Sequence, residues 1–145
     1  MAVQPTWYNQ GMANKKDKHH EWLKKLGFEE KVIHMGTFDF VVVAVIGSSD
    51  NLEEYIAFKY DEPDFDLSES NNGYEPRGKC FYCAGYVPII WIPKKPKTPR
   101  EYATLAHECL HATKHVLRWA GIPFSDDTEE LETHAMGYLI TEILK

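Results

Sequence analysis

One long helix constrains the fold of this chain more than any other feature, and its signals lie between Thr98 and Gly121. Residues 98–101 (TPRE) supply a capping threonine, a proline at the first helical position and a glutamate that closes a capping box. Apolar residues then recur at helical spacing over residues 105–120. Gly121 ends this pattern, and Pro123 stands just beyond it. The sequence therefore predicts one helix over this segment.

A second helix is expected directly after the first. Residues 125–128 carry helix-start side chains, and the run 129–144 (EELETHAMGYLITEIL) follows with apolar residues at helical spacing. The connection at 121–123 (GIP) is short. We therefore expect the two helices to lie antiparallel and in contact.

Two segments rich in β-branched and aromatic residues are expected to form strands. Residues 31–47 (KVIHMGTFDFVVVAVIG) fit either one long strand or a hairpin that turns near Gly36. Residues 80–93 (CFYCAGYVPIIWIP) predict a strand. Pro88 within it indicates an edge strand, because proline has no N–H to donate to an inner ladder.

The remaining segments are shorter or less regular. Residues 14–26 (NKKDKHHEWLKKL) predict an amphipathic helix, with Asn14 as its candidate cap and Gly27 after its end. Residues 51–60 are ambiguous between helix and strand. Residues 61–79 are acidic, polar and rich in proline, asparagine and glycine, which is typical of a mobile loop.

The expected fold is a single α+β domain over residues 1–145, in which a small, mostly antiparallel sheet packs on the long helix and the C-terminal helix. The net charge of −6 is spread along the chain, which argues against nucleic-acid binding. No apolar run reaches the length of a membrane helix, and the first residues lack the pattern of a signal peptide. Three cysteines, an odd number, do not make a disulfide framework and indicate a reducing cytoplasm.

The long helix carries the pattern H-E-x-x-H at His107, Glu108 and His111. Residues four apart project from nearly the same side of a helix, so both imidazoles can bind one ion. Zinc prefers such nitrogens at about 2.0–2.1 Å and lowers the pKa of its water towards about 7. Glu108, one position round the helix, can take a proton from that water without being a ligand. The spacing thus predicts a Zn²⁺ site with Glu108 as catalytic base, against the plain alternative of two histidines on a solvated helix face.

A catalytic zinc site has three protein ligands and one position open to water. The third ligand is expected from the following helix, and Glu130 is the predicted residue. It falls in the first turn, where the helix dipole favours a carboxylate. Glu129 and Glu132 are expected to point elsewhere and to face solvent, while Glu132 or His134 stays open as a substitute.

Further side chains are candidates for supporting the site. Asp126 and Asp127 can accept the second ring N–H of a ligand histidine, or can simply cap the last helix. His134 can bridge to a ligand. The candidate donors to an oxyanion are Tyr82, Tyr86, His134 and Tyr138, of which Tyr138 can equally be a core residue.

Two other features admit a functional and a plain interpretation. Cys80 and Cys83 form a C-x-x-C to which only Cys109 could add a third thiolate, so a structural zinc competes with buried thiols. Residues 94–100 (KKPKTPR) either attract an acidic partner or form a solvated basic loop.

The motif followed by Glu130 resembles the gluzincin arrangement of zinc metallopeptidases. Residues 102–140 resemble the small phage-encoded zincin-like metallopeptidases, with matches at 121–123 (GIP), at Glu130 and at 137–139 (GYL). His134 departs from that pattern, since an aromatic residue often stands there. The resemblance implies a minimal zincin-like fold in the host bacterial cytoplasm. It also implies a strand beside the motif helix that pairs with an extended peptide.

Together these features predict a zinc-dependent metallopeptidase that hydrolyses a peptide or protein substrate, with peptide hydrolysis resting on the resemblance. The alternative is a non-catalytic phage protein that binds a host protein and keeps zinc as a structural staple. A staple would fill the fourth position with Cys109 or His134, whereas an enzyme leaves that position to water.

Overall fold

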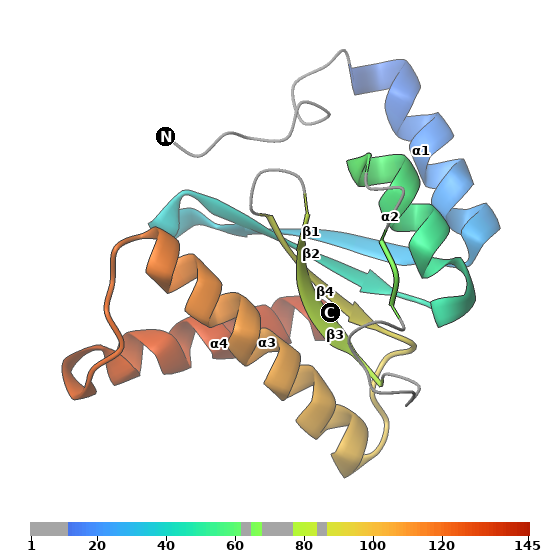
Figure 1. Cartoon of the computed structure of the whole chain (residues 1–145). Coiled ribbons are helices and arrows are strands. Elements are labelled where there is room, and N and C mark those ends of the chain that lie inside the picture. The colour runs from blue at the N-terminus through green and yellow to red at the C-terminus, as the bar shows by residue number, and fades with distance from the viewer. Residues whose placement is uncertain (1–11, 62–64, 68–76, 84–86) are drawn as a thin grey trace.

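The computed structural model describes residues 12–61, 65–67, 77–83 and 87–145 (Figure 1). Most of the predicted loop over 61–79 lies outside these residues. No helix in the described ranges is long and apolar enough to cross a membrane. The helices are α1 (Met12–Leu26), α2 (Leu52–Tyr60), α3 (Pro99–Trp119) and α4 (Glu129–Leu144), and the strands are β1 (Glu29–Met35), β2 (Phe40–Ile46), β3 (Lys79–Cys83) and β4 (Val87–Ile92).

The four strands form one mixed sheet in the order β1-β2-β4-β3. The β1–β2 and β3–β4 pairs are antiparallel, and the β2–β4 pair is parallel. The predicted α+β class is therefore confirmed, with a sheet in which antiparallel pairing predominates. β1 and β3 are the edge strands, and β2 and β4 lie between them.

The prediction of a single edge strand over 80–93 is wrong. The segment holds the antiparallel pair β3 and β4, and β4, which contains Pro88, is an inner strand. Pro88 is tolerated there because it pairs with Tyr82 of β3, while the pairing of β4 with β2 begins one residue later, at Ile89. Its missing N–H lies outside the β2–β4 ladder.

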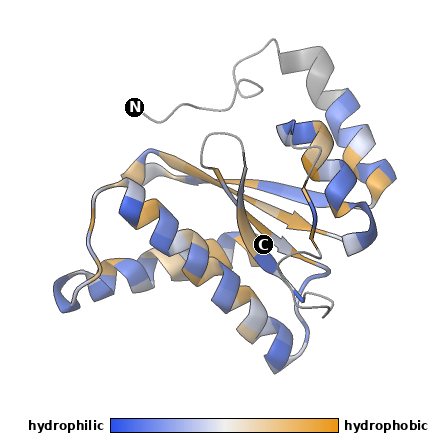
Figure 2. Cartoon of the chain, in the orientation of Figure 1, coloured by the Kyte–Doolittle hydropathy of each residue, from blue (hydrophilic) through white to orange (hydrophobic). Residues whose placement is uncertain are grey.

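Helices cover both faces of the sheet (Figure 1). Val42, Ala44 and Ile46 of β2 point into a core shared with α3 and α4. Val43 and Val45 point into a second core, shared with α1 and α2. Because successive strand residues face opposite sides, an inner strand covered on both faces is apolar throughout, and Figure 2 shows hydrophobic residues concentrated in the strands. The prediction assigned only the two C-terminal helices to the sheet, so the α1–α2 layer is new.

In the N-terminal half, the structure shows which secondary structure the two ambiguous segments adopt. Residues 31–47 form a hairpin, which turns through the 3-10 helix Gly36–Phe38 and a left-handed Asp39 with φ 49°. Residues 51–60 belong mainly to α2. The helix predicted over 14–26 begins two residues earlier, at Met12, so Asn14 is not its cap. It ends as predicted before Gly27, which has φ 74°.

The predicted hairpin of α3 and α4 is confirmed. The Thr98 side chain accepts a hydrogen bond from the Glu101 N–H at 3.3 Å, and the Glu101 carboxylate accepts one from the Thr98 N–H at 3.0 Å. This capping box begins α3. Its end is fixed by Gly121, with φ 73°, and by the Ile122 N–H, which donates to the Leu117 carbonyl at 2.9 Å.

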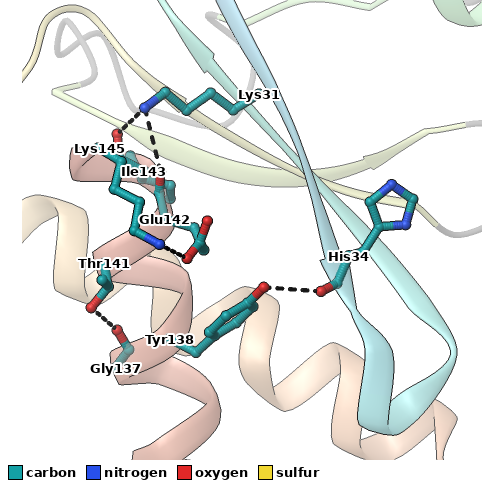
Figure 3. A network of polar contacts seen from close by, with 8 residues as sticks. All are labelled: Lys31, His34, Gly137, Tyr138, Thr141, Glu142, Ile143 and Lys145. Carbon is teal, nitrogen blue, oxygen red and sulfur yellow. Dashed lines mark hydrogen bonds and ion pairs between the residues drawn. The ribbon is translucent and has the colours of Figure 1, made fainter.

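Polar contacts tie α4 to the edge strand β1 (Figure 3). The Lys31 ammonium donates to the carbonyls of Glu142 and Ile143, at 3.4 and 3.1 Å. A cation there satisfies carbonyls that lack partners within the helix and complements the helix dipole. The Tyr138 hydroxyl donates to the His34 carbonyl at 3.2 Å. These contacts hold α4 under β1, while α3 lies against β4 and β3.

Candidate metal centre

His107 and His111 lie one turn apart on the exposed side of α3. Their Nε2 atoms are 3.0 Å apart, and their ring planes meet at 82° with centroids 4.7 Å apart. Leu105 and Cys109, on the opposite side of the helix, are fully buried against the sheet. The helix thus presents two imidazole nitrogens side by side to solvent.

The separation of these nitrogens fits a shared metal ion. Two nitrogens bound to one tetrahedral zinc at about 2.0–2.1 Å lie about 3.3 Å apart. The observed 3.0 Å is close to that value, so small ring rotations would let His107 and His111 reach one ion. A hydrogen bond between a donating and an accepting ring gives a similar spacing without metal.

Glu108 lies on the flank of α3 that faces β3, and it is only 8% exposed. Its Oε2 accepts a hydrogen bond of 2.7 Å from the backbone N–H of Cys80. β3 is an edge strand, so an N–H on its outer side needs a partner other than a strand. The contact fixes the Glu108 carboxylate beside the histidine pair. Sequence reasoning missed this role of Cys80, because it belongs to the backbone and not to the thiol.

The close approach of β3 to α3 depends on Gly78. A Cβ at this position would lie 2.8 Å from the Thr104 Cγ2 and 3.4 Å from the Glu108 Cγ. Glycine therefore lets the chain pass directly against the flank of α3 before Cys80 reaches Glu108.

A cavity of about 530 Å³ opens beside His107 and Glu108. Arg77, just before β3, and Arg100, in the first turn of α3, form part of its wall. Arg77 was not singled out by the sequence, because it falls in the segment 61–79 that was expected to be a mobile loop. Arg100 belongs to the basic segment 94–100, for which the sequence left open an acidic partner or a solvated loop. Arg100 carried a usable signal: it precedes His107 by seven residues, which places both on one side of a helix.

Tyr82 of β3 contacts α3 at His111 and His115. Its hydroxyl donates to the His111 carbonyl at 3.4 Å, and its ring stacks on His115 with centroids 4.1 Å apart. Burial, followed by the nearby Cys80, raises the pKa of Tyr82 to about 12, so it is a neutral phenol near pH 7. Among the other predicted oxyanion donors, Tyr138 bonds to β1, and Tyr86 lies outside the described residues.

The structure does not gather Glu130 with the histidine pair. The Glu130 side chain is 91% exposed and lies 3.5 Å from His134, which is itself 82% exposed. α3 continues from His111 to Trp119, about 12 Å along the helix axis, so the first turn of α4 lies beside the last turns of α3. Among the described residues, no three His, Cys, Asp or Glu side chains come close enough together to hold one ion.

The other acidic residues near the start of α4 differ in exposure. Glu129 is exposed like Glu130, whereas Glu132 is half-buried. Glu132 precedes the buried Leu139 by seven residues, so it lies on the side of α4 that faces the core. Asp127 is exposed in the turn before α4, a position that suits a capping role.

The two described cysteine side chains are free thiols, and neither suits a zinc ligand. Burial raises the pKa of Cys80 to about 12, and that of Cys109, inside the core, also to about 12. Zinc binds the thiolate, which such surroundings disfavour. The Cys83 side chain lies outside the described part of the chain.

Comparison of the chain with protein-family models, curated protein sequences and solved structures finds no match in any of the three. The geometry of the site is therefore the basis for the function proposed below.

Proposed function

We propose that this chain is a zinc-dependent metallopeptidase whose centre is built on His107, Glu108 and His111. One observation carries the proposal: a buried carboxylate, oriented by an edge-strand N–H at 2.7 Å, lines the same cavity as His107, whose Nε2 is 3.0 Å from that of His111. Two histidines on a merely solvated helix face need no such neighbour.

His107 and His111 would hold the zinc ion through their Nε2 atoms. When bound, zinc supplies a positive charge that lowers the pKa of a water molecule and polarises a carbonyl. Both rings lie on the exposed side of α3, and His107 lines the cavity, so a substrate can reach the pair.

Glu108 is the proposed general base. Its carboxylate would accept a proton from the attacking water as that water adds to the peptide carbonyl, and would then give the proton to the leaving nitrogen. The hydrogen bond from Cys80 holds one oxygen in place, so the carboxylate keeps its direction during both steps. Tyr82 is the proposed donor to the oxyanion, since its bond to the His111 carbonyl, at 3.4 Å, is long and easily exchanged.

The proposed third ligand is a carboxylate of α4. Glu130 is the sequence prediction, but its side chain points to solvent and would have to leave His134. Glu132 lies on the inward side of the same helix and is half-buried. Exposure therefore favours Glu132, and either residue would require movement towards His111 before it completes the set.

A peptide substrate is proposed to lie along β3. This strand is an edge of the sheet, and the chain just before it lines the cavity beside His107. An added strand would use backbone hydrogen bonds for affinity and would carry the peptide past the candidate centre. The free thiols of Cys80 and Cys109 support a reducing, cytoplasmic setting such as that of a phage-encoded protein in its host.

The alternative of a non-catalytic zinc staple lacks a fourth ligand in position. Cys109 is fully buried in the core, on the side of α3 opposite the histidines. His134 is exposed on α4 beside Glu130. The structure thus favours a centre that is open on one side.

The variant Glu108→Gln tests the proposed chemistry. Glutamine keeps the shape of the side chain, and its amide oxygen can still accept the Cys80 N–H, so the fold and the zinc content should be retained. Cleavage of a mixed peptide digest, followed by mass spectrometry, should fall by at least about 100-fold, because the general base is lost. Cleavage at the wild-type rate would refute the proposal, and loss of zinc would show that Glu108 is a ligand.

A further inference from the structure

Two arginines line a groove that runs on from the candidate centre. The cavity beside His107 and Glu108 shares Arg77, Arg100 and Thr104 with a second cavity of about 770 Å³. The two cavities are therefore neighbours along one wall. The groove leads from His107, past the N-terminal turns of α3, towards the end of β4.

The charge of this groove is opposite to that of the whole protein. The net charge is −6, and the sequence contains only three arginines, of which two lie here. The third, Arg118, lines neither cavity. Lys94 also lines the second cavity, but it is paired with Glu101 at 2.8 Å, and that carboxylate caps α3 as well. Arg77 and Arg100 thus supply the positive charge that a ligand in the groove would meet.

We propose that Arg77 and Arg100 bind a carboxylate of the substrate and so determine which peptides are cleaved. This inference rests on the proposed peptidase function. An arginine guanidinium matches a carboxylate with two parallel hydrogen bonds, which gives direction as well as affinity. Peptides offer this group either as an Asp or Glu side chain or as the C-terminal carboxylate.

The geometry also gives the position of that carboxylate. Arg100 and His107 lie on one side of α3 and are seven residues apart, which is about 10 Å along the helix. An extended peptide advances about 3.3 Å per residue. The acidic group should therefore lie about three residues away from the cleaved bond, always on the same side of it.

A binding experiment tests the inference without any turnover. The full-length protein, labelled with ¹⁵N, would be titrated with N-acetyl-aspartic acid amide, N-acetyl-alanine, N-acetyl-asparagine amide and inorganic phosphate. Both carboxylate probes, or one of them, should shift the amide signals of Gly78, Ala103 and Thr104, whereas the neutral asparagine probe should not. The stronger of the two identifies a side-chain or a terminal carboxylate as the preferred group.

The matched variants separate these arginines from general charge effects. Arg77→Gln with Arg100→Gln should weaken carboxylate binding by about tenfold or more, since two charge-assisted contacts are lost. Arg118→Gln removes the same charge from the same helix as Arg100 and should leave the affinity unchanged. Equal binding of the asparagine probe, full affinity in the double variant, or a response to phosphate alone would overturn the inference.

Cleavage profiles distinguish a failure of the arginine assignment from a failure of the proposed peptidase function. With the wild-type protein, cleaved peptides should be enriched in Asp, Glu or a chain end at the fixed position, and the double arginine variant should lose that enrichment while still cleaving. Cleavage without any acidic preference would overturn the arginine assignment alone. Carboxylate binding without any cleavage that depends on Glu108 would overturn the peptidase proposal and leave the binding groove standing.

Discussion

Glu30 and Glu108 are both withdrawn from solvent, but they have different hydrogen-bond partners. These partners indicate a structural role for Glu30 and agree with the proposed chemical role of Glu108. Glu30, on β1, accepts hydrogen bonds from the Tyr55 hydroxyl and the Lys59 ammonium, with the His19 ring nitrogen 3.4 Å away. Its carboxylate is thus surrounded by donors inside the α1–α2 side of the protein. Glu108 is held by a backbone N–H and borders a cavity. Because Glu108 borders a cavity, its carboxylate can still exchange a proton with a ligand there.

Removing Glu30 should be costly. Lys59 has a side chain only 5% exposed, and Glu30→Ala would leave this buried ammonium without its partner carboxylate. Loss of one partner of a buried ion pair costs about 3–5 kcal/mol in the free energy of unfolding. Urea denaturation of Glu30→Ala and of the control Glu29→Ala would measure this. Glu29 is 46% exposed and should contribute less than about 1 kcal/mol, so equal losses in the two variants would contradict this role of Glu30.

The same cluster predicts how stability depends on pH. Burial alone would raise the pKa of Glu30, but the hydrogen bond from His19 and the charge and hydrogen bond of Lys59 together lower it from 4.5 to about 2. A pKa that is lower in the folded state gives stability that is present above the unfolded-state value and is lost as the pH falls. The loss should therefore run from about pH 4.5 towards pH 2, and Glu30→Gln should flatten that part of the curve. Parallel curves for wild type and variant would show that Glu30 is not responsible.

Three neighbouring carboxylates at the start of α4, Glu129, Glu130 and Glu132, can be compared as the proposed third zinc ligand. We expect Glu132→Ala to weaken zinc binding by about tenfold or more, because Glu132 is the one half-buried carboxylate of the three. Glu129→Ala should change little, and Glu130→Ala should have an effect only if its exposed side chain swings to the histidines. Competition with a chelating dye would give all three affinities. A larger loss in Glu130→Ala would restore the ligand predicted from the sequence.

The α3–α4 hairpin depends on a left-handed residue at its turn. Gly121 has φ 73°, which a side chain with a Cβ adopts at a cost of about 1–2 kcal/mol, so Gly121→Ala should destabilise the protein by that amount. Gly137 is the matched control, because it lies inside α4 and a Cβ there would meet nothing within 4 Å. Gly137→Ala should stabilise by about 0.5–1 kcal/mol. Thermal unfolding of both variants would test the signs, and destabilisation by both would contradict this view of the turn.

Local signals predicted the helices, and long-range pairing escaped them. The capping box at Thr98 and the glycine after α3 are determined by neighbouring residues, so the sequence was sufficient. The hairpin near Gly36 was one of two alternatives, and the structure shows that it forms. The order of the strands depends on residues far apart in the chain, such as Val43 and Ile89. Pro88 misled the prediction because the pairing of β4 with β2 begins only at Ile89, so Pro88 lies in an inner strand without interrupting that ladder.

The candidate site was predictable to the same extent. The spacing of His107, Glu108 and His111 follows from one helix, and the structure places them as that helix requires. The partner of Glu108, the two groove arginines and the exposure of Glu130 depend on how β3 and α4 dock on α3. The spacing of residues within one segment does not predict how that segment docks on another.

The sheet separates two helical layers, each with its own hydrophobic core. α1 and α2 enclose the Glu30 cluster on one face, and α3 and α4 carry the candidate centre on the other (Figure 1). The edge strand β3 joins the sheet to the centre, through the Cys80 N–H. Changes in the Glu30 cluster should therefore alter stability while leaving zinc affinity of the folded protein unchanged.

Measuring the zinc content of the protein directly tests whether His107 and His111 bind zinc. The purified full-length protein, supplied with zinc and then dialysed, should retain about one zinc ion per chain by native mass spectrometry. The double variant His107→Ala with His111→Ala should retain almost none, while His115→Ala, one turn further along α3, should keep the wild-type content. Near-full zinc in the double variant, or none in the wild type, would contradict the assignment of His107 and His111 as a zinc site.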